Sequence, residues 1–570
     1  MKAFRILILI ALSIQCTPSP SEQLTKAIEE FQSFKSYDSD EYPLGDYSEE
    51  RFEKQAEFWQ KTLNKVKAIP VEKLNDDERI SHKLLAFVLK NRLGSHEFKM
   101  HYNPILSDAG FHNSLVYRVR PLTTKKVAFK YLNLIQAIPE YINQNMVLIQ
   151  KGIDMGISQP KVIFKGYETS YNQHITVDAE SNFYFKPFLD LPDSLTETEK
   201  DSLQIEAKKA IEEGVIPSFK KVKSFFEDNY YLTTRDEIGV GSTPRGNDFY
   251  QNRINFYTTL DLNAEQIHQI GLDEVARIRL EMDKIISEVE FKGSFEDFFT
   301  FLRTDKQFYA KSPKELLMFA RDVSKRLDEQ LPRYFSTLPR KPYGVAPVPA
   351  SIAPKYTAGR YIGTSPNSTD PGYYWVNTYD LPSRPLYAIP ALTAHEAVPG
   401  HHLQGSLNSE LPNTIPQFRR DLYLSAYGEG WGLYTESLAA EMGIYTTPYE
   451  RFGQLTYSMW RACRLVVDTG MHVYGWSREK AVNYMASNTA LSLHEINTEI
   501  DRYISWPGQA LAYKIGEIQI RNLRAKAEEA LGSNFDIRAF HEVILGKGTL
   551  TLPLMEEEVE SYIIRVQNNE

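Results

Sequence analysis

The segment 395–402 carries three histidines and a glutamate within eight residues, in the order HEAVPGHH. Imidazole and carboxylate groups are the usual protein ligands of catalytic zinc, and a glutamate directly after the first histidine can act as a base toward water at the metal. This composition predicts one zinc ion, with His395 as its first ligand and Glu396 as the general base.

The spacing of the histidines departs from the usual zinc-peptidase motif, in which the two ligands lie four residues apart on one helix face. On a regular helix, His401 would lie roughly 240° around the axis and about 9 Å along it from His395. Pro399 cannot donate a backbone hydrogen bond and Gly400 tolerates unusual backbone angles, so we expect a bulge or kink there. His401 is favoured as the second ligand. His402 is the alternative, or else a substrate contact.

A carboxylate from a second helix is the expected third ligand. The segment 421–442 has a helical apolar rhythm and contains Glu429 and Glu436, which fall on nearly the same face. Glu429 has glycine on both sides, and a third glycine follows. Each glycine costs a helix about 1 kcal/mol, which indicates close packing at a site. Glu429 is therefore the favoured ligand and Glu436 the alternative.

Four polar residues recur at helical spacing further along the chain: Arg461, Arg464, Asp468 and His472. On an exposed helix, such a face is most often a solvated ladder of ion pairs that contributes little. Near a metal it could instead supply His472 as a catalytic group and the two arginines as substrate-binding groups. Both interpretations remain open.

The segment 493–516 contains Arg502 and Tyr503 side by side, followed by a Pro-Gly break and Tyr513. A buried tyrosine hydroxyl can donate to a developing oxyanion, and an arginine can hold the terminal carboxylate of a peptide. The alternative for each tyrosine is simple packing with a satisfied hydroxyl.

Taken together, the motifs HEAVPGHH, EGWGLYTE and RYISWPGQALAYKIG resemble the bacterial family called domain of unknown function 885, from about Phe31 to the C-terminus. That family looks like a relative of the helical zinc peptidases of the gluzincin type. The resemblance implies a mainly α-helical body with a deep cleft, and it adds weight to Arg502, Tyr503 and Tyr513 as site residues. It is informative about fold and site rather than about substrate.

Apolar residues at spacings of three and four predict helices over 48–66, 76–91 and 194–228. The polar segment 243–255 is expected to interrupt the helices, after which Asn263 caps a long helix that runs to about residue 288. This interruption is the best candidate for a lobe boundary. We therefore expect an N-terminal helical lobe over 16–240 and a C-terminal metal-binding catalytic lobe over 241–570, with the cleft between them.

The segment 347–390 is rich in proline, glycine, tyrosine and serine and is predicted to form a small β element before the metal helix. Residues 373–376 have strong strand propensity. In zinc peptidases, an edge strand at this place pairs with the extended substrate backbone. We expect that role here, with a hairpin that merely covers the helix as the alternative.

The N-terminus has the pattern of a secretory signal over residues 1–15, because Lys2 and Arg5 precede a short apolar run. Cys16 follows that run where a lipid-modified cysteine would lie, although Gln15 replaces the small residue expected before it. We predict an exported protein that is either a membrane-anchored lipoprotein or periplasmic. Only Cys463 remains after Cys16, so no internal disulfide is expected.

The net charge of −9 is spread along the chain, and no basic stripe or aromatic platform for nucleic acid is present. A Gly-rich phosphate loop and a serine nucleophile elbow are also missing from the sequence. The sequence therefore predicts a zinc-dependent peptidase with a peptide substrate, no nucleic-acid partner, and membrane contact only through Cys16. A metal-dependent hydrolase of a non-peptide amide or ester, and a catalytically silent peptide-binding lipoprotein, are the alternatives.

Overall fold

The computed structural model describes residues 18–34, 41–350, 352–365 and 368–568. The predicted signal segment 1–15 and Cys16 lie outside these residues. Helices make up most of the described chain and three strands form one small sheet, so the mainly α class and the small β element are confirmed. In the described ranges, no helix combines the length and the apolar character needed to cross a bilayer.

Helices α1–α12 precede the sheet in the sequence. They are α1 (Pro20–Ser33), α2 (Glu49–Lys67), α3 (Asp76–Glu97), α4 (Lys125–Gln136), α5 (Ile138–Asp154), α6 (Thr169–Asn172), α7 (Glu197–Ala210), α8 (Ile216–Asp228), α9 (Gly246–Thr258), α10 (Ala264–Glu288), α11 (Phe295–Thr304) and α12 (Pro313–Tyr334).

The strands and the remaining helices follow without a long interruption. They are β1 (Tyr343–Pro347), β2 (Gly359–Ile362), β3 (Gly372–Val376), α13 (Ile389–Glu396), α14 (His401–Ser409), α15 (Gln417–Arg420), α16 (Ser425–Glu441), α17 (Pro448–His472), α18 (Arg478–Asn488), α19 (Leu493–Ser505), α20 (Ala512–Leu531), α21 (Ile537–Leu545) and α22 (Leu552–Gln567).

Capping residues explain where the best-predicted helices begin. The Ser48 side chain accepts the backbone N–H of Arg51 and opens α2. Asn263 and Gln266 form a reciprocal capping box at the start of α10, which ends at Glu288 as predicted.

The prediction that the polar segment 243–255 interrupts the helices is wrong, because most of this segment belongs to α9. Its polar residues lie among a buried stripe of Tyr250, Ile254 and Tyr257, at spacings of four and three. Burial of that stripe against neighbouring helices outweighs the weak helix propensity of the asparagines between its members.

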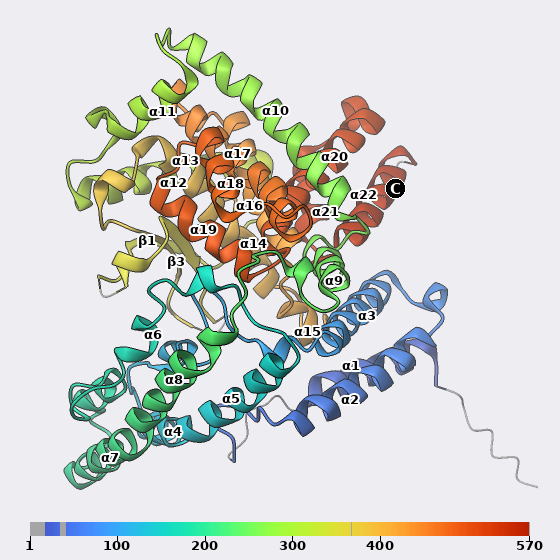
Figure 1. The fold of residues 1–570 in the computed structure, drawn as a ribbon. Coiled ribbons are helices and arrows are strands. Elements are labelled where there is room, and N and C mark those ends of the chain that lie inside the picture. The colour runs from blue at the N-terminus through green and yellow to red at the C-terminus, as the bar shows by residue number, and fades with distance from the viewer. Residues whose placement is uncertain (1–17, 35–40, 351, 366–367, 569–570) are drawn as a thin grey trace, which may run out of the picture.

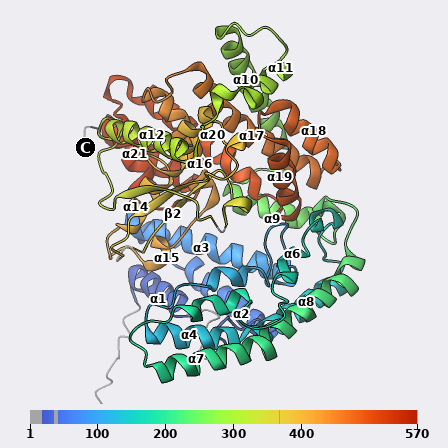
Figure 2. The same cartoon turned by 90° about the vertical axis from the view of Figure 1, so that its left-hand side faces the viewer.

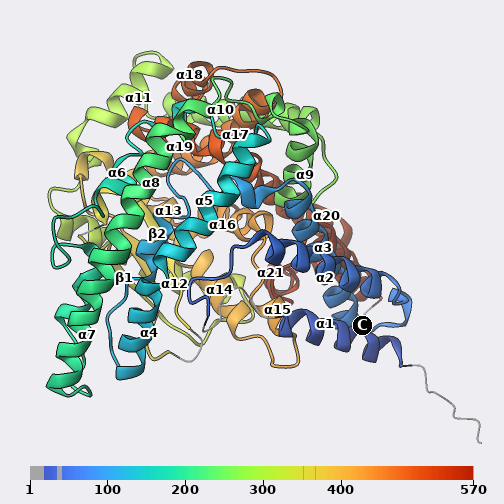
Figure 3. The same ribbon diagram turned by 60° about the horizontal axis from the view of Figure 1, so that its bottom comes forward.

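Helices α1–α8 lie together on one side of the molecule, and α16–α20 lie on the other (Figures 1 and 2). Turning the molecule brings α1–α8 to the front as one layer (Figure 3). The buried apolar side chains, however, form two clusters that each draw from both sides of residue 240. One joins α4–α8 to α17–α19, and the other joins α1–α3 to α16 and α20–α22. The lobe division at residue 240 stays a prediction.

The sheet has the strand order β1-β3-β2, with β3 parallel to β1 and antiparallel to β2. The predicted strand over 373–376 is confirmed as β3. Its expected role as the substrate-pairing edge is wrong, because both of its edges are occupied. Strand propensity indicates an extended segment but does not say which strands will flank it. The free edge beside the metal helix belongs to β2, whose Tyr361 N–H donates to Oε2 of Glu396 at 2.8 Å.

Candidate metal centre

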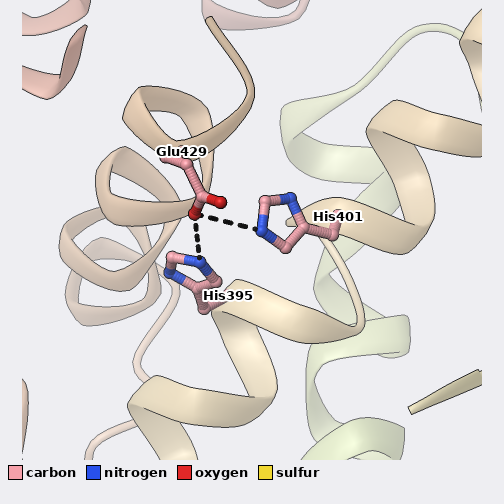
Figure 4. Close-up of side chains that lie close together, drawn as sticks. All are labelled: His395, His401 and Glu429. Atoms are coloured by element: carbon pink, nitrogen blue, oxygen red, sulfur yellow. Dashed lines mark ion pairs between the residues drawn. The ribbon is translucent and has the colours of Figure 1, made fainter. Parts of the chain in front are cut away.

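Three side chains from three helices converge on one point. His395 lies near the end of α13, His401 at the start of α14, and Glu429 in the first half of α16. One ligand atom from each lies within 4.8 Å of the others (Figure 4). Oε2 of Glu429 is 3.5 Å from Nε2 of each histidine. This is the set that the sequence favours for the metal.

A break in the helix brings the two histidines together. α13 ends at Glu396 and α14 begins at His401, so the expected kink is a complete interruption of four residues. A Cβ atom at Gly400 would lie 1.9 Å from the carbonyl oxygen of His395, which no side chain could tolerate. The indole of Trp431 donates to the carbonyl of Pro399 at 2.9 Å and holds the break against α16.

Glycines let α16 approach both α13 and α20. A Cβ at Gly432 would lie 2.7 Å from Cε1 and Nε2 of the His395 ring. A Cβ at Gly430 would lie 2.6 Å from the backbone of Gly516 in α20. The glycines of the EGWGLYTE motif therefore serve close packing directly around the histidine ligand.

The second carboxylate of α16 contacts the far side of the His395 ring. Oε1 of Glu436 lies 2.8 Å from Nδ1 of His395, and the Glu436 side chain is completely buried. A carboxylate at this position fixes the imidazole tautomer and directs Nε2 toward a metal. The structure thus brings both candidate carboxylates to the site, with Glu429 toward the metal position and Glu436 behind the first histidine.

The charges at the site suit a cation. Burial lowers the pKa of His395, but the carboxylates of Glu429 and Glu436 outweigh it and raise the pKa to about 10. Burial also raises the pKa of Glu429, yet contact with His395 and His401 holds it well below its usual range. Two imidazoles and one carboxylate are the ligands of a catalytic zinc site, which keeps a further position for water or substrate. The residues present therefore fit zinc.

Tyr423 is a site residue that the sequence did not single out. Its hydroxyl donates to Oε1 of Glu429 at 3.0 Å, and its ring occupies the space that a side chain at position 428 would need. Tyr423 lies in the connection between α15 and α16, outside the helical repeat, so no spacing rule could link it to Glu429.

Glu396 lies beside the triad, where the general base is expected. Its carboxylate accepts the N–H of Tyr361 from the free edge of β2, and its charge contributes to the raised pKa of His395. The group is thus held between the metal ligands and the edge strand.

His402 points away from the metal position. Its Nδ1 lies 3.3 Å from the hydroxyls of Tyr361 and Ser406, and its ring packs against Tyr343. Burial lowers the pKa of His402 to about 4. The structure therefore brings His401 rather than His402 to the triad.

The predicted substrate-binding residues gather in a second cluster. Nε of Arg464 donates to the hydroxyl of Tyr503 at 2.6 Å, and its guanidinium lies 4.2 Å from the ring centre of Tyr513. Arg502 donates to Gln509 at 3.0 Å. The cluster adjoins the metal centre, because the guanidinium of neighbouring Arg461 lies 3.9 Å from Oε1 of Glu436.

The structure does not bring His472 to either cluster. Its Nδ1 accepts the N–H of Val240 at 3.1 Å, and its Nε2 donates to the carbonyl of Tyr503 at 3.0 Å. Burial lowers the pKa of His472 to about 4, so the ring is neutral and both nitrogens are used. In this arrangement the side chain joins α17 to α19 and to the segment before α9.

Two solved structures share this fold. One is described as a "putative lipoprotein" from Colwellia psychrerythraea; it is 27% identical, with a TM-score of 0.87, and the match covers 97% of this chain and 100% of that one. The other is described as a "putative lipoprotein of unknown function" from Shewanella oneidensis, with 19% identity, a TM-score of 0.70, and coverage of 95% and 99%. The second likeness concerns the fold alone. No curated protein matches the chain.

The family comparison agrees with the motifs around the metal centre. Residues 32–559 match the family described as "Bacterial protein of unknown function (DUF885)", which covers the metal centre and the arginine-tyrosine cluster. The chain therefore belongs to the DUF885 family.

Proposed function

We propose that this protein is a zinc-dependent peptidase that hydrolyses peptide bonds in peptide substrates. One observation carries the proposal: Glu396 lies next to a triad of His395, His401 and Glu429 whose ligand atoms fall within 4.8 Å of one another. The buried Glu436 behind His395 adds the outer carboxylate that orients metal-binding histidines. This combination is the arrangement of a hydrolytic zinc site.

Zinc in this site would polarise the scissile carbonyl and make water acidic enough to lose a proton near neutral pH. Glu396 takes that proton and delivers it to the leaving nitrogen. The C–N bond breaks, the carbonyl carbon keeps the water oxygen, and the products are a carboxylate and an amine. Tyr423, whose hydroxyl donates to Glu429, and Tyr513 would be the hydroxyl donors for the oxyanion.

The edge strand provides a way to hold an extended substrate. The Tyr361 N–H of β2 faces the site and donates to Glu396. A peptide lying along this edge would add a strand to the sheet beside the metal. Such pairing orients a backbone without selecting its sequence, which suits a peptidase.

We also propose that the protein is exported and anchored as a lipoprotein through Cys16. The signal-like segment before Cys16 supports this, and both structural neighbours carry the word lipoprotein in their descriptions.

A second candidate function is a peptide-binding lipoprotein without catalysis. The observation that favours it is the hydrogen bond from Tyr361 to Glu396, because it occupies one oxygen of the carboxylate that would have to take the proton. The family and the more distant neighbour are both of unknown function, which agrees with this candidate. A hydrolase of a non-peptide amide or ester would use the same groups as the peptidase.

The test combines metal analysis with hydrolysis. The purified protein is measured for zinc by elemental mass spectrometry and then incubated with a peptide library and with small ester and amide substrates. Glu396→Gln is compared with Glu528→Gln, which alters an exposed carboxylate paired with Arg524 on α20. Stoichiometric zinc in both variants, with cleavage of peptides lost only in Glu396→Gln, supports the proposal.

Three other results would replace it. Cleavage of esters or small amides but not peptides would favour the non-peptide hydrolase. Zinc and peptide binding without any cleavage would favour the silent binding protein. Wild-type turnover in Glu396→Gln would remove Glu396 as the base.

A further inference from the structure

Two buried guanidinium groups lie one helical turn apart on α17 and lack full hydrogen bonding. Arg461 is 7% exposed and Arg464 is 2% exposed. Nε of Arg461 and Nη1 of Arg464 are buried and have no partner among the described residues. Leaving a buried donor unpaired is costly, and more so for a charged group. These two donors are therefore available for a ligand.

Two aromatic side chains, Trp460 and Tyr513, each contact both guanidinium groups. The guanidinium carbons of Arg461 and Arg464 lie 4.2 Å and 4.6 Å from the ring centre of Trp460. Both also lie over Tyr513, at 6.0 Å and 4.2 Å. Stacking of this kind fixes the plane of each guanidinium, which prepares it for a planar, two-pronged partner such as a carboxylate.

Two of the carboxylates nearby, Glu499 and Glu436, are already engaged. Glu499 accepts from Arg464 at 2.9 Å and lies 3.4 Å from Arg502, so it serves two arginines. Glu436 is held by His395, and its 3.9 Å separation from Arg461 is too long for a hydrogen bond. Among the described residues, Arg461 therefore has no hydrogen-bonded carboxylate, and it lies beside the candidate metal centre.

The distance from the Arg461 guanidinium to the metal position matches the span of a substrate that has one residue after the scissile bond. Contacts of 3.9 Å to Glu436 and 2.8 Å from Glu436 to Nδ1 of His395 place its guanidinium within roughly 11 Å of the metal position, allowing about 2 Å across the imidazole ring and about 2 Å for a zinc–nitrogen bond. In a peptide, the carboxylate of the residue after the scissile bond lies about 4–5 Å from the scissile carbonyl carbon. Adding a metal–oxygen bond and an Arg–carboxylate hydrogen bond gives a span of about 10 Å.

A cavity of about 200 Å³ is lined by Tyr457, whose ring contacts the Arg461 guanidinium. Its wall includes Ile389 and Leu392 of α13 and Tyr457 of α17, and the Arg461 guanidinium lies 4.8 Å from the Tyr457 ring centre. The volume suits one side chain and is smaller than the pockets that hold drug-sized ligands. Most of its surface is apolar, although Arg303, Arg384 and Glu495 also line it, and burial raises the pKa of the Glu495 carboxyl to about 6.

We propose that Arg461 and Arg464 form a subsite for the terminal carboxylate of a peptide, and that the neighbouring cavity takes the apolar side chain of its last residue. The substrate class is then peptides with a free C-terminal carboxylate, cleaved before the last residue. Cleavage rests on the proposed peptidase function. Carboxylate binding does not.

The first measurement needs no substitution. Zinc-loaded wild-type protein is given matched peptides that end in leucine or phenylalanine, each as the free acid and as the C-terminal amide. The expected kcat/KM for the acid exceeds that for the amide by about thirty-fold or more, the usual range for losing one partner of a buried charge pair. Equal rates for acid and amide would overturn the subsite.

Arg461→Met tests the subsite at the cost of one weak hydrogen bond, because within the described residues Arg461 makes only a 3.4 Å contact to its own helix. The expected result is collapse of the acid-over-amide preference, seen mainly in KM. The control is Arg524→Met, at a guanidinium paired with Glu441 near the far end of α16, which should keep the preference. A preference that survives Arg461→Met would contradict the assignment.

A binding arm separates the subsite from the peptidase proposal. Zinc-loaded Glu396→Gln, with and without Arg461→Met, is titrated calorimetrically with the same acid and amide peptides. Tighter binding of the acid that depends on Arg461 supports the subsite even when wild-type protein cleaves nothing, in which case only the peptidase proposal fails. Equal binding of acid and amide, or a preference independent of Arg461, overturns the subsite even when cleavage is observed.

Discussion

Nδ1 of His395 lies 2.8 Å from Oε1 of Glu436, so Glu429 and Glu436 of α16 reach opposite sides of one imidazole ring. Glu429 faces the metal position and Glu436 faces the protein interior. The step of seven residues from Glu429 to Glu436 corresponds to almost two helical turns, so both side chains lie on the same helix face. A single helix therefore supplies one metal ligand and also orients another.

Replacing Glu436 by glutamine should weaken zinc binding by about 10–100-fold, because loss of the charged partner lowers the basicity of His395 and frees its tautomer. Competition with a chelator measures the zinc dissociation constant, and circular dichroism checks the fold. Glu441→Gln, five residues further along α16, is the matched control. Unchanged zinc affinity in Glu436→Gln would show that the carboxylate does not orient the ligand.

The two neighbouring histidines should respond differently to alanine. His401→Ala should lose stoichiometric zinc because it removes one of three ligands, whereas His402→Ala should retain it because that ring contacts Tyr361 and Ser406 instead. Elemental analysis of both purified variants gives the answer. Zinc loss in His402→Ala but not in His401→Ala would reverse the assignment.

Gly432→Ala should disturb the metal centre without touching a ligand. The added Cβ would lie 2.7 Å from the His395 ring, so the ring or the helix must move. Gly405→Ala in α14 is the control, since its Cβ would meet its nearest neighbour at an ordinary 3.5 Å. We expect reduced zinc content and a lower melting temperature for Gly432→Ala alone. Equal behaviour of both variants would argue against close packing at position 432.

Asp468 should make stability depend on pH. Burial raises its pKa from 3.8 to about 7, although Tyr250 and Gly508 donate to one of its oxygens. The folded protein then binds a proton that the unfolded chain releases near pH 4, so this carboxyl lowers the free energy of unfolding as pH rises from about 4 to 7.

Asp468→Asn removes this titration, so the free energy of unfolding should depend less on pH in the variant than in wild type. Relative to wild type, the free energy of unfolding of the variant should rise by roughly 2–3 kcal/mol between pH 5 and pH 8 in urea unfolding, since about two pH units of the shift fall in this window. Asp273→Asn, at an exposed position on α10, is the control. If the free energy of unfolding changes with pH in the same way in wild type and in Asp468→Asn, the expectation is contradicted.

Local patterns predicted most of the helices and the residues of the triad, because caps, apolar spacing and ligand types act over a few residues. Asn263 is an example, since its capping box lies entirely within four residues. Contacts between distant segments were not predictable in this way. The pairing of Glu436 with His395 depends on how α13 packs on α16, and the central place of β3 depends on strand order.

The lack of information about distant contacts also explains why Tyr423 was not predicted at the site and why His472 lies away from it. Tyr423 reaches Glu429 from a connecting segment with no helical repeat. His472 shares a helix face with Arg464, but α17 runs on past the site, and its last turn lies against Tyr503 and the segment before α9. A shared face gives direction around the axis and not position along it.

The interruption between α13 and α14 also changes how the site can vary in sequence. In a continuous helix, one inserted or deleted residue rotates everything after it by about 100° and would carry the second ligand away from the metal. Here the direction of His401 is set by the contacts of α14 and by Trp431, which anchors the Pro399 carbonyl, and not by the helical phase of α13. The interval between the two imidazoles is therefore set by this packed loop and not by a helical repeat, and a fixed four-residue spacing of histidines would miss a site of this kind.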